Sequence, residues 1–323
     1  MYNTTKPYKK QIMDLVKKTW NTPFVSVKNS CITKHFISHS EYHHTDGIGT
    51  KGIYHFQKRS FKYAVIDALA MNLNDMALQR AIPYALTNHL FLPEDDQKAI
   101  IEIINHLSKE CKNKNIAITG GETAIHNNIE GLELSITMLG FLNKPPKINK
   151  FRIGDALIGI KSNGLHSNGF TKIRELYGND LKPEFIAPTY IYSNLILDIC
   201  SKFNIYGMTH ITGGGFTKIK NFLRKNADAA ILNNHKLNSH HIFYEIHRKM
   251  FIKKNAIETD KEMYKTFNCG IGFIFGIKKE DVIKCLNFIK EKSDFEADII
   301  GKIIPGVGNV IIYSQFSNLT MVL

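Results

Sequence analysis

Acidic and glycine residues stand side by side in the stretch HHTDGIGTKG, where Asp46 precedes Gly47 and Lys51 precedes Gly52. No glycine occurs before Gly47. Glycine lets the backbone adopt a positive φ or approach a ligand closely, and an aspartate near a lysine can serve a metal ion and a phosphate group. The stretch therefore indicates either a nucleotide site or a hairpin turn, because Asp-Gly between extended segments is also a common turn sequence.

The next segment, YAVIDALAMNLNDMALQRAIPYAL, sets polar residues into an apolar helical pattern. Asp67, Asn74 and Asp75 fall within an arc of roughly 100° on such a helix. A helix this apolar should be largely buried, and a buried carboxylate is unfavourable unless it is paired or bound to a metal ion. The pattern favours a cation site over an exposed polar stripe.

A further carboxylate, Glu122, follows Gly120 and Gly121 in TGGETA. The acidic residues at positions 46, 67, 75 and 122 are distant in the sequence, so they could act together only if the fold gathered them. Carboxylate oxygens suit Mg²⁺ that bridges phosphate oxygens, whereas Zn²⁺ prefers cysteine and histidine. The 14 histidines show no zinc-binding spacing, and most are expected to be surface or core residues.

Two glycine-rich stretches, GLHSNGF and THITGGGF, each precede a predicted helix. Backbone N–H groups at the start of a helix bind anions, although serine or asparagine there can also be a simple helix cap. Together with FNCGIG, the two stretches indicate a phosphorylated ligand. The sequence contains neither GxxxxGK[ST] nor GxGxxG after a strand, so any use of ATP needs a different architecture.

Strands and helices that could position these residues alternate along the chain. In the first half we expect a short amphipathic helix near Ile12, a helix from residue 63 that ends or bends at Pro83, strands over 89–92 and 132–142, and a helix over 94–115. Residues 116–125 indicate a strand, a tight turn and a polar tip. The second half predicts strands over 156–160 and 267–277, and helices over 170–176, after residues 213–215, and over 278–292.

The stretch NKPPKINKFRIGD marks a domain boundary, because its proline, lysine and asparagine content differs from its surroundings. We therefore predict an α/β protein of the α+β type with two domains, residues 1–147 and 148–323. A chain of 323 residues with 43% hydrophobic residues can fill two ordinary cores.

The composition also limits which cellular compartment and which binding partners are expected. No apolar run approaches the ~20 residues of a membrane span, and the first residues lack the apolar core of a signal peptide. Five cysteines without a CxxC pair indicate free thiols in a reducing compartment, and thus a cytoplasmic protein without a membrane partner. The net charge of +13 comes mostly from dispersed lysines. Because no nucleic-acid-binding motif accompanies it, we interpret it as a solvated surface and expect no nucleic-acid partner.

Taken in order, the motifs resemble the phosphoribosylformylglycinamidine cyclo-ligase family, the aminoimidazole ribonucleotide synthetases. The resemblance rests on TDGIGTK, IDALAMNLNDMALQRAIP, GGETA, GDALIGIKSNGLHSNGF, APTYIY, HITGGGF and EMYKTFNCGIGF. It implies an ATP-binding and metal-binding N-terminal domain, a substrate-binding C-terminal domain, and a homodimer joined through the N-terminal sheets. It also implies ATP-dependent ring closure of formylglycinamidine ribonucleotide to 5-aminoimidazole ribonucleotide, ADP and phosphate in purine biosynthesis.

The resemblance further implies roles for individual residues. Asp46, Lys51 and His166 are the expected catalytic residues: Lys51 would neutralise phosphate charge, and His166 would polarise or protonate the reacting oxygen. For His166 the alternative is a structural hydrogen bond within its loop. The expected Mg²⁺ ligands are Asp46, Asp75 and Glu122, with Asp67 in a supporting position. The expected ATP-binding residues are Asp46, Lys51, Asp67, Asn74, Asp75, Gly120, Gly121, Glu122 and Thr123. The expected substrate-binding and phosphate-binding residues are His166, Ser167, Asn168, Gly169, His210, Thr212, Gly213, Gly214, Gly215, Asn268 and Gly270.

Three features depart from the family pattern. The family usually begins with a glycine-rich segment that closes over ATP, which this chain lacks or replaces. Arg80 stands where glycine is expected, and it could pair with an anion or cap the helix end. The stretch GGETAIHNN lacks the usual EMPG. The altered N-terminus leaves open a non-catalytic member of the same ATP-binding fold that acts as a binding or scaffold protein.

Overall fold

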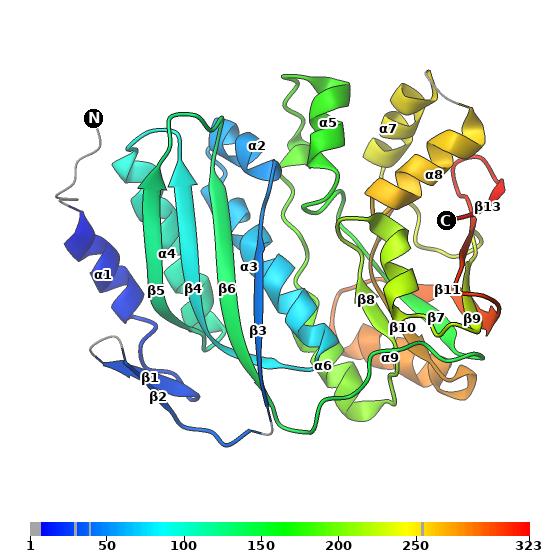
Figure 1. Cartoon of the computed structure of the whole chain (residues 1–323), viewed down its shortest axis with the longest axis horizontal. Helices are drawn as coiled ribbons and strands as arrows, with labels where there is room; N and C mark the ends of the chain where they lie inside the picture. Colours follow the sequence, from blue (N-terminus) through cyan, green and yellow to red (C-terminus); the bar gives the residue numbers. More distant parts are fainter. Residues whose placement is uncertain (1–7, 29–30, 39, 253–254) are drawn as a thin grey trace. The chain divides into compact units, whose positions relative to one another are not determined.

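The computed structural model describes residues 8–28, 31–38, 40–252 and 255–323 (Figure 1). It divides into two compact units. The first comprises the chain up to Pro146 together with Leu181–Ile191, and the second comprises Lys147–Asp180 and Tyr192–Leu323. Residues 181–191, which the sequence-based division assigns to the C-terminal domain, thus belong to the first unit. Both units mix strands and helices, which confirms the predicted α/β class. Within the described ranges, no helix is long and apolar enough to cross a membrane.

The first unit is built on a four-stranded sheet with the order β3-β6-β4-β5. Strand β4 runs parallel to β5, and the other neighbouring pairs are antiparallel. The strand predicted over residues 132–142 is confirmed as β6, and the one predicted over 89–92 is the end of the longer β4. The bounds are β3 (Ser40–Gly47), β4 (Ile82–Leu92), β5 (Ala117–Ile125) and β6 (Glu133–Leu142).

Helices α3 and α4 cover one face of this sheet (Figure 1). Helix α3 is buried along most of its length because its sequence is almost wholly apolar. Helix α4 presents an apolar stripe to the core, and the carboxylate of Asp96 caps its start by accepting from Ala99 N at 2.9 Å. The bounds are α2 (Lys51–Lys58), α3 (Phe61–Leu78) and α4 (Gln97–Asn113).

The opposite face of the sheet has a hairpin at one end, formed by β1 (Val25–Lys28) and β2 (Cys31–Lys34). The Phe36 ring beside this hairpin stacks on Phe141 of β6, with ring centroids 3.9 Å apart. Figure 1 shows no helix of the first unit over the rest of this face, among the described residues. Within the first unit, the middle of the sheet is therefore open on that side.

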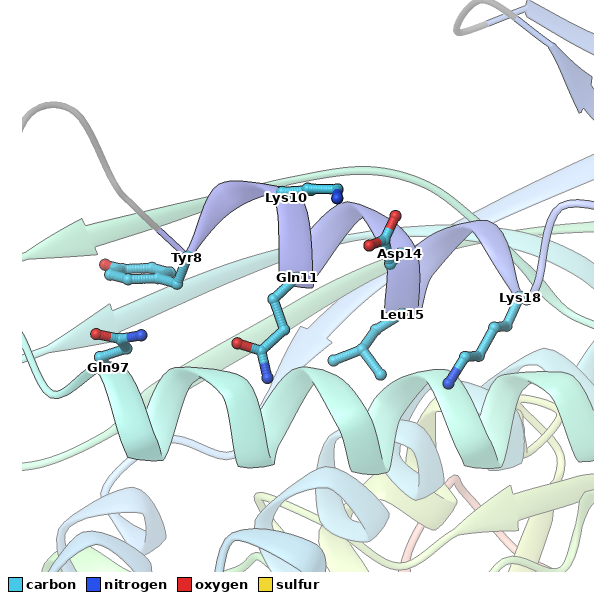
Figure 2. Close-up of a pocket in the computed structure, with 7 residues that line it drawn as sticks. All are labelled: Tyr8, Lys10, Gln11, Asp14, Leu15, Lys18 and Gln97. Carbon is cyan, nitrogen blue, oxygen red and sulfur yellow. The ribbon is translucent and has the colours of Figure 1, made fainter.

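Helix α1 (Lys9–Lys17) lies along α4 (Figure 2). Figure 2 shows Leu15 and Gln11 pointing toward α4, at a groove of about 550 Å³. Ser108 Oγ of α4 donates to Leu15 O at 2.6 Å. After the helix, Trp20 Nε1 donates to Ile118 O of β5 at 2.9 Å, and Ile118 N donates to the Thr19 hydroxyl at 2.9 Å. The first helix of the described residues is therefore docked on α4 and β5.

Two local predictions in the first unit are wrong, and one of two open alternatives is excluded. Strand β5 runs straight through Gly120 and Gly121, where a tight turn was expected, with only a shift in register before them. Asp46 and Gly47 end strand β3, and α2 begins at Lys51, so this stretch is a strand-to-helix connection and not a hairpin. Helix α3 ends at Leu78, and the proline expected to end or bend it, Pro83, lies inside β4.

The second unit contains a seven-stranded sheet with the order β13-β12-β9-β11-β7-β10-β8. Its central strands β7 and β10 are apolar and almost entirely buried, as expected for strands covered on both faces. The predicted strand over 156–160 is confirmed, whereas the one predicted over 267–277 begins only at Ile271. The bounds are β7 (Ala156–Lys161), β8 (Met208–His210), β9 (Ala227–Ile231), β10 (Ile271–Ile277), β11 (Ala297–Pro305), β12 (Val310–Tyr313) and β13 (Thr320–Val322).

Figure 1 shows α7 and α8 on one side of this sheet and α9 on the other. The predicted helix over 170–176 is confirmed as α5, but the helix expected after residues 213–215 is a 3₁₀ helix, η2. The helix bounds are α5 (Phe170–Tyr177), α6 (Ser193–Lys202), η2 (Gly215–Phe222), α7 (His241–Phe251), α8 (Ala256–Thr266), η3 (Lys279–Asp281) and α9 (Val282–Lys292), while η1 (Pro183–Phe185) belongs to the first unit.

Candidate functional site

Lys51 and Asp67 form a fully buried ion pair in the first unit. Lys51 Nζ at the start of α2 lies 2.8 Å from Asp67 Oδ2 of α3, and both side chains are wholly buried. His55 Nε2 donates to the same carboxylate oxygen at 2.8 Å, and its Nδ1 accepts from Ser60 Oγ at 2.8 Å. The partner that the buried Asp67 requires is therefore supplied by the neighbouring helix.

Burial governs the pKa values of this group. It opposes ionisation of Asp67, but the Lys51 ammonium and the His55 imidazole outweigh it and hold the pKa of Asp67 far below 3.8. Burial lowers the pKa of Lys51 and the pKa of His55, although Asp67 opposes both shifts. Asp67 is therefore ionised at neutral pH and acts only as a hydrogen-bond acceptor.

The same ion pair holds the segment Leu181–Ile191 within the first unit. Thr189 donates to Asp67 Oδ1 through its backbone N–H at 2.7 Å and through its hydroxyl at 2.5 Å. Lys51 Nζ donates to Ala187 O at 2.6 Å. Both charged side chains are thus engaged with protein groups, and their expected contact with ATP stays a prediction.

Two polar residues near the end of α3 also have structural partners. Asn74 Nδ2 donates to Tyr190 O at 2.9 Å, which adds a fourth bond to the segment 181–191. Arg80 has a φ of 59°, and the next residue, Ala81, donates its N–H back to Met76 O at 3.1 Å. This is the left-handed position that closes many helices and favours glycine. The glycine usual in the family is explained by this backbone conformation.

Asp46 at the end of β3 and Asp75 on α3 flank His44. The His44 Nε2 atom lies 3.5 Å from Asp75 Oδ2, and its Nδ1 lies 3.0 Å from Asn72 Oδ1. Asn72 Nδ2 in turn donates to Asp46 O at 3.1 Å. Burial lowers the pKa of His44, but its carboxylate and amide neighbours outweigh burial and raise it above 6.5. The polar groups of this corner therefore favour a positive charge on His44 itself.

Glu122 lies away from that corner. It is exposed on β5, at one edge of the sheet, whereas Asp46 is on β3 at the other edge. Across the ladder, Asp46 pairs with Ile136, Ile136 with Asn88, and Asn88 with Gly121. Three strand spacings correspond to about 14 Å, and successive residues point to opposite faces. Among the described residues, no group of three or more acidic, histidine or cysteine side chains is arranged to hold one metal ion.

A cavity of about 220 Å³ lies between α1 and strand β5. Ile12, Val16 and Trp20 form an apolar wall, and Gly120 and Gly121 line the side formed by β5, beside Glu122 and Thr123. A Cβ atom at Gly121 would lie 2.6 Å from Asn88 Oδ1, so glycine is required beside that side chain.

Asn88 lines the same cavity from β4, and its side chain is only 8% exposed. Among the described residues its carboxamide makes no hydrogen bond, and its polar atoms are not sealed from solvent. A ligand in the cavity can therefore bond to this amide, which carries both a donor and an acceptor. The cavity is thus apolar, with one amide available for recognition.

His166 and His210 are buried near one another in the second unit. Their ring centroids are 6.4 Å apart, and the Tyr192 ring lies 6.0 Å from His166. A Cβ atom at Gly272 would lie 2.6 Å from His166 Cε1 and 2.1 Å from Tyr192 Oη. His166 itself has a φ of 58°. A strained backbone and a required glycine at one place are typical of a functional loop.

Asn268 joins two loops of the second unit. Its Oδ1 accepts from Ser162 Oγ and from Gly270 N, both at 2.9 Å, and its Nδ2 donates to Gly164 O at 2.8 Å. The side chain is fully buried. Both the oxygen and the NH₂ group of the Asn268 side chain are therefore hydrogen-bonded within the protein. Its expected contact with substrate stays a prediction.

The predicted glycine-rich loops have the backbone conformations that only glycine adopts readily. Gly169 precedes α5 with a φ of 71°, and a Cβ there would lie 2.3 Å from the Phe267 ring. Gly214 and Gly215, with φ values of 86° and 51°, lead into η2. Gly213 has open space around it. Among the remaining predicted residues, Ser167 is half-buried and Gly270 has a φ of 95°. Asn168 Nδ2 donates to Ile211 O at 3.1 Å, and the Thr212 hydroxyl accepts from Lys218 Nζ.

Sequence reasoning missed His44 and Asn88. His44 is two residues before Asp46 on the same strand, so the alternation of side chains in a strand could have identified it. No local pattern identifies Asn88, because only the pairing of β4 with β5 brings it beside Gly121.

Both halves of the chain match family models. Residues 38–142 match the N-terminal domain of AIR synthase related proteins, and residues 152–314 match the C-terminal domain. A phosphoribosylformylglycinamidine cyclo-ligase of Methanococcus maripaludis is 32% identical over 280 residues, which cover 81% of this chain and 77% of that protein. The protein of the same name from Pyrococcus furiosus is 35% identical over 259 residues, which cover 76% and 74% of the two chains.

Solved structures share the fold at low sequence identity. The hydrogenase maturation protein HypE in complex with ATP superposes with a TM-score of 0.68 at 14% identity, covering 97% of this chain and 93% of HypE. PurL of T. maritima complexed with FGAR gives a TM-score of 0.60 at 12% identity, covering 98% of this chain and 49% of PurL. At these identities the likeness concerns the fold alone.

Proposed function

This chain belongs to the AIR synthase family of phosphoribosylformylglycinamidine cyclo-ligases, and we propose that it performs the family's reaction. It converts formylglycinamidine ribonucleotide and ATP to 5-aminoimidazole ribonucleotide, ADP and phosphate in purine biosynthesis. The observation that carries this proposal is the similarity to cyclo-ligases over about four-fifths of the chain, including both domains.

The reaction needs ATP because an amide oxygen is a poor leaving group. The γ-phosphoryl group moves from ATP to the formyl oxygen of the substrate, and ADP leaves. The amidine nitrogen then attacks the activated carbon, and the carbon–oxygen bond breaks to release phosphate. Protein groups contribute mainly by positioning the reactants and neutralising charge.

The cavity between α1 and β5 is where we place the adenine ring of ATP. Its volume of about 220 Å³ is below that of pockets for drug-sized ligands, roughly 300–1,000 Å³, so it suits one planar base. An asparagine amide can donate and accept at once, which matches the N6 and N7 edge of adenine. The exposed Gly120 and Gly121 at the rim leave room for the ribose and phosphates.

ATP binding should therefore change the fluorescence of Trp20, the single tryptophan of the chain. We expect a saturable change with ATP, ADP and adenosine, but none with tripolyphosphate, which lacks the base. Asn88→Ala should weaken ATP binding about 10-fold, because the base loses its paired hydrogen bonds. If calorimetry confirms ATP binding but the Trp20 fluorescence does not change at saturating ATP, the adenine base does not bind in this cavity.

Asp46 and Asp75 are the residues we assign to Mg²⁺. Their fit to a cation rests on the contacts of His44, whose Nε2 lies 3.5 Å from Asp75 Oδ2 and whose partner Asn72 bonds to Asp46 O. When bound, Mg²⁺ neutralises charge on phosphate oxygens. Glu122 of the same chain lies about 14 Å from Asp46 by strand spacing, so it could join one shared ion only from a second copy.

In the second unit, the loops at 166–169 and 212–215 are the proposed site for the substrate phosphate, with His166 acting on the reacting oxygen. Open space around Gly213 and the positive φ of Gly214 and Gly215 leave their backbone accessible to an anion. We assign Asn268 and Asn168 to holding these loops, because their amides bond the protein.

A second copy of the chain is the partner we propose for the open face of the four-stranded sheet. Half-buried Thr87, His89, Ser135 and Thr137 lie on that face, and Thr45 Oγ1 lies 2.9 Å from Thr137 Oγ1. An antiparallel sheet can leave one face solvated, and this face without helices of its own is where we place the second copy. Sedimentation equilibrium that gave the mass of one chain would rule out this homodimer.

The proposed activity is tested directly by measuring turnover of the purified protein in a reducing buffer, which keeps its thiols reduced as in the cytoplasm. We expect formation of 5-aminoimidazole ribonucleotide that depends on formylglycinamidine ribonucleotide, ATP and Mg²⁺ together. If authentic substrate gives no product although ATP binds, the chain is the scaffold protein that the altered N-terminus suggested.

A further inference from the structure

The residues after Ser314 lie beyond the region that matches the C-terminal family model, which ends at residue 314. They form a loop over residues 314–319 and the last strand, β13, which pairs with β12. The loop folds back onto the second unit through its side chains and its backbone. The loop lies next to the FNCGIG stretch, which includes the predicted substrate-binding residues Asn268 and Gly270.

Gln315 makes the central contact of this loop. Its Nε2 donates to Cys269 O at 3.0 Å, and its Oε1 accepts from Ser239 N at 3.2 Å. Its backbone N–H donates to Tyr264 Oη at 3.1 Å. The Gln315 side chain therefore bridges two separate loops with both ends of its amide.

The residue that Gln315 holds is in a strained conformation. Cys269 has a φ of 47°, in the left-handed region that non-glycine residues seldom occupy. Such a conformation persists only where surrounding contacts enforce it. The Cys269 carbonyl accepts a second bond from Ser239 Oγ at 2.5 Å, so Gln315 and Ser239 together fix this peptide.

The fixed peptide connects directly to the loop of His166. Asn268, the residue before Cys269, donates to Gly164 O at 2.8 Å, and Gly164 is two residues before His166. Ser162 N also donates to Gly270 O at 2.9 Å. A continuous series of bonds thus links Gln315 through residues 268–270 to the backbone that carries His166.

We propose that Gln315 is a positioning residue for ring closure: it fixes residues 268–270 and, through Asn268, the loop of His166. The catalytic part of this inference rests on the proposed function, whereas the structural part does not. A displacement of about 1 Å at a reacting group can lower a rate by up to 100-fold. A residue outside the matched region can therefore affect turnover.

A second anchor of the same loop provides a control. Ser317 Oγ donates to the carboxylate of Asp260, which also accepts from His247 Nε2 at 2.7 Å. The His247 ring stacks on Phe316 with centroids 5.1 Å apart. This anchor holds the loop to α7 and α8 and makes no bond to residues 268–270.

Gln315→Met tests the proposal, because methionine has a similar length and makes neither side-chain hydrogen bond. We expect kcat to fall about 10-fold with little change in the KM for ATP. Hydrogen exchange should become faster at the amides of Gly270 and Ile271, which bond to Asn268. The matched control, Ser317→Ala, should lower thermal stability while kcat stays within about twofold of the wild type.

Unchanged exchange at residues 270 and 271 in Gln315→Met would overturn the structural part of the inference. Faster exchange with an unchanged kcat, or an equal loss of kcat in Ser317→Ala, would overturn the positioning role. If the wild-type protein lacks cyclo-ligase activity, the proposed function fails, and the exchange measurement still decides the structural part.

Discussion

Asp46→Asn is expected to lower kcat about 100-fold or more, the usual effect of losing a central electrostatic group. The Asp46 Oδ1 atom accepts from Gly47 N at 2.7 Å, and an asparagine oxygen can keep this bond. The substitution therefore removes the charge while preserving the local backbone. Steady-state kinetics across a range of Mg²⁺ concentrations measures the effect, and partial recovery at high Mg²⁺ would identify weakened metal binding.

Glu41→Gln is the matched control for Asp46→Asn. Glu41 is an acidic residue on the same strand, exposed on the opposite face, where it pairs with Lys34. The kcat of the Glu41→Gln variant should stay within about twofold of the wild type. A value of kcat for Asp46→Asn within threefold of the wild type would remove Asp46 from the proposed metal site.

Asp67→Asn should destabilise the first unit by about 3–5 kcal/mol, because it leaves the Lys51 ammonium buried without a counter-charge. The side chains are wholly buried, so solvent cannot replace the lost partner. Urea unfolding followed by the fluorescence of Trp20, which belongs to the first unit, measures this change.

The double variant Lys51→Met/Asp67→Asn completes the test as a double-mutant cycle. It should recover part of the lost stability, because no unpaired charge remains buried. A double variant as unstable as the sum of the single variants would contradict a coupled pair. The pH dependence has a defined sign: Asp67 has a depressed pKa, so its contribution is present above pH 3.8 and is lost as the pH falls below that value.

The burial of Asp67 could be predicted from the sequence, but its partner could not. An aspartate within an almost wholly apolar helix must be paired or bound to metal. The apolar pattern of α3 is visible in the sequence, whereas the packing of α2 against α3 decides that Lys51 and His55 supply the pairing. Composition within one helix carries no information about the neighbouring helix.

The glycines of TGGETA illustrate a second limit. Adjacent glycines indicate a turn when read locally, yet here they continue strand β5. Gly121 is required because Asn88 of β4 approaches it closely. That contact depends on strand pairing, which joins residues distant in the sequence.

The packing of β3 against α3 places two of the predicted metal ligands near one histidine. Asp75 lies beside His44, and Asn72 contacts both His44 and the backbone carbonyl of Asp46. Glu122 is separated from them because β3 and β5 are the two edges of the sheet. Sequence motifs identified all three acidic residues, but only the topology separates them.

The most direct test of ATP-dependent ring closure uses formylglycinamidine ribonucleotide labelled with ¹⁸O at the formyl oxygen. We expect this oxygen to become part of the released phosphate, with one labelled phosphate for each 5-aminoimidazole ribonucleotide formed. Release of unlabelled phosphate, or hydrolysis of ATP without ring closure, would contradict transfer of the phosphoryl group to the formyl oxygen.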